Sequence, residues 1–128
     1  MGDKITISGN IQNSILNIKS TLTNVQQSVG SMSTQDEAAR QELKSLIEQL
    51  SQALQDVPDG KKEQAEAVAA SAQALVETAQ ADKPNKTLLQ ITGDGLKKAA
   101  ENLAEVAPAV AGIAGQVIAL VMRMKGLA

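Results

Sequence analysis

Apolar residues recur along the first quarter of the chain at alternating spacings of four and three. They are Ile11, Ile15, Ile18, Leu22, Val25, Val29 and Met32. Such a stripe is typical of a coiled-coil seam. The residue types around it favour strands and turns instead, because Ser, Thr, Asn and β-branched Ile are poor helix formers. We therefore expect a short β element over residues 4–20, followed by a helix that begins within residues 19–24.

The residues that surround this stripe are mostly uncharged Ser, Thr, Asn and Gln. A strand edge or helix face of this composition favours self-association, because no charge opposes pairing with another chain. We therefore interpret residues 1–33 as an N-terminal β and oligomerisation segment. The alternative is that the same apolar set closes the protein's own core. The candidate interface consists of five apolar residues of this segment: Ile11, Ile15, Ile18, Leu22 and Val25.

Two segments with helical periodicity follow. The first covers residues 35–56, begins after a capping box formed by Thr34 and Glu37, and ends before the turn signal at residues 58–60. The second covers residues 60–82, is rich in alanine, and ends at residues 83–85. Because the two segments have similar lengths and a short link, we expect them to form an antiparallel helical hairpin.

The C-terminal part carries an apolar repeat of seven residues, which predicts one long apolar helix over residues 95–125, kinked at Pro108. The repeat consists of Leu96, Leu103, Val110, Val117 and Met124. The alternative is a break, with Pro108 in the first turn of a separate helix. Small residues at every fourth position form a ribbon on which another helix can pack closely. This ribbon consists of Ala107, Ala111, Gly115 and Ala119.

The most apolar stretch, residues 106–122, allows two interpretations. It is either the central helix of a bundle, apolar all round because protein surrounds it, or a segment that enters a bilayer. A membrane-spanning helix needs about 20 predominantly apolar residues, and this stretch is shorter and rich in Ala and Gly. We therefore expect a mainly α protein with a single domain over residues 1–128. A helical bundle occupies residues 34–125, and the short β element precedes it.

Composition excludes most chemistry. The chain has no Cys and no His, which removes disulfides, thiol catalysis, imidazole acid–base catalysis and most transition-metal sites. It has no aromatic residue on which a nucleic-acid base could stack, and its net charge of -2 gives no electrostatic attraction to nucleic acid. A Ser or Thr nucleophile would lack a partner base. We therefore expect no catalytic, cofactor-binding or metal-binding residue, no small-molecule substrate and no nucleic-acid partner.

Two runs carry a resemblance to a known group of proteins. Residues 9–11 and 17–25 (GNI and NIKSTLTNV) resemble the N-terminal signature of small bacterial proteins that are frequent in cyanobacteria. Residues 85–89 and 95–97 are also similar to that group. The group has no assigned activity, so the resemblance implies a bacterial origin and transfers no functional residue. Its members often carry additional glycines in the first part, which favours strand and turn there.

These observations predict a protein that functions by contact. We expect a non-enzymatic oligomerisation or protein-interaction module, or a scaffold, that forms a homo-oligomer or binds a protein partner. The N-terminus lacks a basic region followed by an apolar run, so we expect no signal peptide and a cytoplasmic location. Two alternatives stay open. One is a membrane-active protein that inserts residues 106–122 in the manner of helical pore-formers, and the other is a filament subunit that pairs through β edges.

Overall fold

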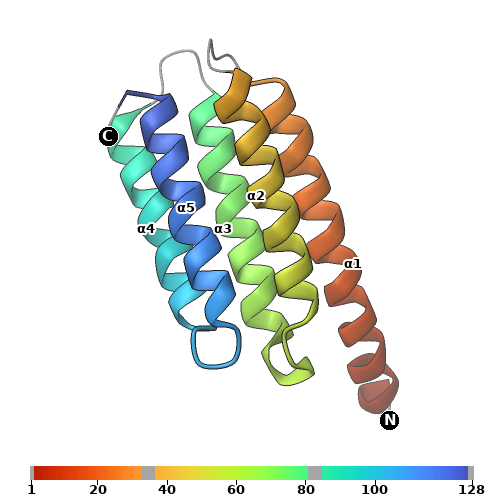
Figure 1. Cartoon of the computed structure of the whole chain (residues 1–128). Coiled ribbons are helices and arrows are strands. Elements are labelled where there is room, and N and C mark those ends of the chain that lie inside the picture. The colour runs from red at the N-terminus through yellow and green to blue at the C-terminus, as the bar shows by residue number, and fades with distance from the viewer. Residues whose placement is uncertain (1, 33–36, 81–84, 127–128) are drawn as a thin grey trace.

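A computed structural model describes residues 2–32, 37–80 and 85–126 of the chain, which fold as an up-and-down bundle of α-helices (Figure 1). A short 3₁₀ turn, Asp59–Lys61, precedes the third helix. The odd-numbered helices run in one direction and the even-numbered helices run in the other (Figure 1). The α-helices are α1 (Gly2–Gly30), α2 (Glu37–Gln55), α3 (Lys62–Gln80), α4 (Lys86–Glu101) and α5 (Pro108–Met124).

The helices form two layers, with α3 in the middle of the larger one. α1 and α4 pack on either side of α3, and α2 and α5 cover this layer while packing against each other. The predicted helices over residues 35–56 and 60–82 correspond to α2 and α3, which are consecutive and antiparallel. However, α2 packs mainly against α1 and α5, whereas α3 packs mainly against α1 and α4. The two helices are therefore sequence neighbours that lie diagonally across the bundle.

Alanine explains why α3 can occupy this central position. α3 is the helix that contacts each of the other four in the described parts of the chain. Small side chains let neighbouring helix backbones approach closely, and the larger Val and Leu residues between them fill the remaining space. The aliphatic core is therefore organised around one helix of low side-chain volume. The buried apolar residues of α3 are Ala65, Val68, Ala69, Ala72, Leu75, Val76 and Ala79.

The predicted β element over residues 4–20 is wrong, because residues 2–30 form the single helix α1 and the described residues contain no strand. The apolar stripe explains the outcome. Its residues from Ile18 to Met32 are buried in the core, against α2 and α3. Helix propensities differ by less than about 1 kcal/mol per residue, and packing of an apolar face outweighs them. The spacing of the apolar residues therefore predicts the structure of residues 2–30 correctly, whereas the strand preference of the residue types does not.

The predicted long helix over residues 95–125 is also wrong. α4 already begins at Lys86, where the side chain of Asn85 caps the helix by accepting a hydrogen bond from the backbone N–H of Leu88 at 3.0 Å. It ends at Glu101, and after a turn the antiparallel α5 begins with Pro108 in its first turn, which was the alternative. Proline lacks an N–H and its ring would clash with the preceding turn of a continuous helix.

The repeat of seven residues did not reveal this break, because both helices face the same core. Leu96 on α4, Leu103 in the turn, and Val110 and Val117 on α5 are all fully buried. The turn itself is held by backbone hydrogen bonds, among them one from the N–H of Ala107 to the carbonyl of Leu103 at 2.7 Å. A periodic apolar pattern therefore continues through a reversal of chain direction.

Gly93 is a point of close contact between α4 and side chains of α5. A Cβ atom at this position would lie 3.3 Å from Cε of Met122 and 3.5 Å from Cγ2 of Ile118. Two residues further along α4, Gly95 is exposed, and a Cβ there meets nothing within 4 Å. The same helix thus carries one glycine in close contact with its neighbour and one that is open to solvent.

We expect Gly93→Leu to lower the free energy of unfolding by about 1–3 kcal/mol, because the larger side chain pushes α4 away from α5. The matched variant Gly95→Leu should be neutral or stabilise the protein by up to about 1 kcal/mol, since leucine is the better helix former. Urea unfolding followed by far-ultraviolet circular dichroism measures both. Equal effects of the two substitutions would contradict the close packing of α4 and α5 at Gly93.

Candidate functional site

The first candidate surface lies where α1 leaves the bundle. α1 has 29 residues, whereas α2 and α3 have 19 each. At a rise of 1.5 Å per residue, α1 is about 15 Å longer than either neighbour. Figure 1 shows its N-terminal turns extending beyond the ends of α2 and α3. This part of the helix therefore projects from the bundle.

The predicted interface residues divide along α1. Ile18, Leu22 and Val25 are fully buried in the protein's own core, which was the alternative interpretation of this set. Ile15 is half-buried at the point where α1 leaves the bundle. Ile11 belongs to the projecting part of α1, and its side chain lies outside the described residues. The C-terminal part of the stripe, from Ile18 onward, is therefore core, and its N-terminal part belongs to the projecting end of α1.

Sequence reasoning missed Leu16, which is 59% exposed. Leu16 lies beside the stripe rather than on it, so the spacing of four and three does not select it. The sequence did contain a signal for Leu16: a leucine that lies outside the apolar face of a helix points away from the core and is exposed. Together with Ile15 it forms an apolar pair at the base of the projection.

Two hydrogen bonds fix α1 in the bundle above this point. The side-chain amide of Asn17 donates to the carboxylate of Glu66 on α3 at 3.1 Å. The side-chain amide of Gln26 donates to the backbone carbonyl of Lys44 on α2 at 3.3 Å. These two bonds supplement the apolar packing of the buried stripe, and they link α1 to both α3 and α2 from Asn17 onward.

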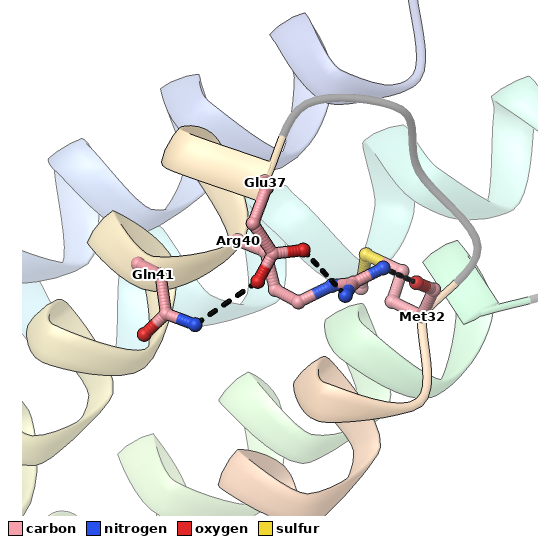
Figure 2. A network of polar contacts seen from close by, with 4 residues as sticks. All are labelled: Met32, Glu37, Arg40 and Gln41. Atoms are coloured by element: carbon pink, nitrogen blue, oxygen red, sulfur yellow. Dashed lines mark hydrogen bonds and ion pairs between the residues drawn. The ribbon is translucent and has the colours of Figure 1, made fainter.

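A polar network joins the end of α1 to the start of α2 (Figure 2). The guanidinium of Arg40 donates to the backbone carbonyl of Met32 at 2.8 Å and to the carboxylate of Glu37 at 2.7 Å. The other oxygen of Glu37 accepts from the side-chain amide of Gln41 at 3.1 Å (Figure 2). Arg40 therefore satisfies the carbonyl of Met32, which follows α1, and orients the first turn of α2. Its role in these contacts is structural.

The second candidate surface is the outer face of α5. The predicted packing ribbon divides here: Ala107 and Ala111 are half-buried against the core, whereas Gly115 and Ala119 are exposed. A Cβ atom at Gly115 would meet nothing within 4 Å, so no helix of the described residues packs closely on that part of the ribbon. The buried face of α5 is a different one, formed by Val110, Ala114, Val117, Leu120 and Val121.

Polar groups elsewhere serve the fold. Lys62 is only 4% exposed, and its Nζ donates to the backbone carbonyl of Gln55 at 2.6 Å, which satisfies the C-terminus of α2. A groove of about 370 Å³ between α1 and α2 is lined mostly by uncharged side chains, with Lys19 and Glu48 as its charged residues. Among the described residues, no group of three or more Asp and Glu side chains is placed to hold a metal ion.

In the ranges that the structure describes, no helix is both long enough and apolar enough to cross a membrane. α5 contains most of the stretch for which insertion was the alternative interpretation. It has 17 residues, and its apolar buried face is occupied by α2, α4 and α3.

One family model matches the chain, over residues 43–125, and its description is a domain of unknown function, DUF4404. The chain belongs to this family. No curated protein and no solved structure matches the chain. The matched range includes α3, α4, α5 and most of α2. The N-terminal signature in residues 9–25 lies outside it, so the resemblance to cyanobacterial proteins stays a prediction.

We expect Arg40→Met to lower the free energy of unfolding by about 1–3 kcal/mol, because the carbonyl of Met32 loses a charged donor. Glu37→Gln removes the negative charge of the ion pair, whose acidic side chain is largely exposed, and should cost less than about 1 kcal/mol. Thermal or urea unfolding of both variants measures the difference. A larger effect of Glu37→Gln would mean that the ion pair matters more than the bond to Met32.

Proposed function

We propose that this member of the DUF4404 family is a non-enzymatic protein-interaction module and that the projecting end of α1 is its docking element. The observation that supports the proposal is the apolar pair Ile15 and Leu16 at the base of a helix that extends beyond its neighbours. The apolar stripe of the core continues past this pair to Ile11. A second helix, from a protein partner or another copy of the chain, would extend the seam.

The energetics of the projection support docking. Isolated helices shorter than about 12–15 residues are marginal in water, and the residue types of residues 2–14 are poor helix formers. Contact with another helix would stabilise this end of α1 by packing. Burial of an exposed leucine side chain would contribute about 1.5–3 kcal/mol to such a contact. The few charges near this end of the chain place little electrostatic restriction on the partner.

The two alternatives receive less support. The filament hypothesis required β edges in residues 4–20, which form part of α1 instead. The membrane hypothesis required release of residues 106–122 from the bundle, in which Val110, Val117 and Val121 are fully buried. The catalytic classes excluded by composition stay excluded on the same grounds of residue type. The cytoplasmic location stays a prediction, which fractionation of the producing cells would test.

We expect Leu16→Asp to weaken association of the full chain about tenfold or more, because a carboxylate replaces the apolar contact at the docking element. The matched variant Ser20→Asp adds the same charge at an exposed position of α1 within the bundle and should leave association unchanged. Cross-linking in the producing cells, together with sedimentation velocity of the purified chain, measures partner binding and self-association. Equal behaviour of both variants in both experiments would contradict the proposed docking element.

A further inference from the structure

The link between α2 and α3 contains an aspartate that is followed by a glycine. These residues, Asp59 and Gly60, begin the 3₁₀ turn at the lower end of the bundle in Figure 1. The same dipeptide occurs inside α4, as Asp94 and Gly95. All four residues are exposed, and a Cβ atom at either glycine would meet nothing within 4 Å. The two sites therefore share residue types and exposure, and they differ in the backbone structure around them.

An aspartate followed by glycine reacts with its own backbone, because glycine has no side chain to obstruct its nitrogen. The backbone nitrogen of the glycine attacks Cγ of the aspartate. A carbon–nitrogen bond forms, one molecule of water leaves, and the product is a cyclic succinimide. Water then adds to one of the two ring carbonyls and opens the ring. The result is either aspartate again or isoaspartate, in which the main chain runs through Cβ and Cγ. The water that is lost first is regained, so the reaction needs no other reagent.

The backbone at Gly60 is available for this attack. Its N–H donates no hydrogen bond to another group of the described residues, because the first N–H groups of a helical turn have no partner within it. The turn is held by the N–H of Lys61, which donates to the carbonyl of Pro58 at 2.8 Å, and by the N–H of Lys62, which donates to the carbonyl of Asp59. A rotation that brings the nitrogen of Gly60 toward Cγ of Asp59 breaks only the second of these bonds.

The same rotation is more costly at Asp94. Gly95 lies in the interior of α4, so its N–H and the carbonyl of Asp94 both belong to the hydrogen-bond ladder of the helix. The residues on either side of the dipeptide, Gly93 and Leu96, are buried against the core. The peptide group therefore cannot rotate unless the helix opens locally and loses packing. The free energy of that opening should slow the attack at Asp94 by at least about tenfold.

We propose that Asp59 is a site of spontaneous modification, which converts to isoaspartate through a succinimide with Gly60, and that α4 protects Asp94 from the same reaction. Isoaspartate adds one carbon to the main chain of the turn, which displaces the carbonyl that accepts from the N–H of Lys62. Lys62 is the first residue of α3, and its buried Nζ donates to the carbonyl of Gln55 at 2.6 Å. The modification therefore acts on the start of the central helix. It is independent of the docking element on α1.

The first experiment measures the site and its selectivity. The full chain is incubated at neutral pH in water enriched in heavy oxygen, and its peptides are sequenced by electron-transfer dissociation, which distinguishes isoaspartate from aspartate. Isoaspartate that carries heavy oxygen should form at Asp59 at least about tenfold faster than at Asp94. In urea that unfolds the chain, the two sites should react at similar rates, because α4 no longer protects Asp94.

The second experiment tests the chemistry and its consequence with two variants. Asp59→Glu should abolish the reaction at this position, because the longer side chain would have to close a larger ring. Gly60→Ala should slow it severalfold without disturbing the fold, since nothing lies within 4 Å of the new Cβ. The purified isoaspartate form should be cleaved by trypsin after Lys61 and Lys62 severalfold faster than the fresh protein. Asp59→Glu that has been incubated for the same time should be cleaved at the rate of the fresh protein.

Three results would overturn the proposal. One is a folded chain in which Asp59 stays unmodified, or reacts no faster than Asp94. Another is a preference for Asp59 that persists in urea, because the selectivity would then come from the local sequence and not from the fold. The third is an isoaspartate form that trypsin cleaves at the rate of the fresh protein, because the modification would then leave the start of α3 unchanged.

Discussion

Close packing around α3 is the constraint on which this bundle depends. The chain has no Phe, Trp or Tyr, so each buried residue removes less apolar surface from water than an aromatic residue would. An aliphatic core must compensate with dense packing, because attraction between atoms falls away across even a narrow gap. Ala65, Ala69, Ala72 and Ala79 on α3 meet this requirement by letting neighbouring helices approach. α3 is central because its side chains are small.

The sequence predicted the elements that local signals mark, and it failed where local and long-range signals disagree. The start of α2 was predicted from a capping box of Thr34 and Glu37, of which Thr34 lies outside the described residues, and the start of α3 was predicted from the turn before it. In α1 the residue types favoured strand, but burial of Ile18, Leu22 and Val25 was worth more than propensity. For α4 and α5, the repeat of Leu96, Leu103, Val110 and Val117 was real, yet two antiparallel helices that face one core show the same repeat as one long helix.

The candidate surfaces were only partly predictable for a related reason. A stripe or ribbon in the sequence shows which residues share a helix face, but it does not show what covers that face. Three residues of the predicted interface are covered by α2 and α3, and two residues of the predicted ribbon are exposed. Leu16 escaped notice because it lies off the stripe, and its exposure depends on where α1 leaves the bundle.

The glycines of α4 and α5 show how the two kinds of surface differ physically. Gly93 and Gly115 carry the same cost in helix stability, yet only Gly93 has a neighbour that benefits from it. Small residues thus set how closely the helices approach inside this protein: alanines do so around α3, and Gly93 does so where side chains of α5 meet α4.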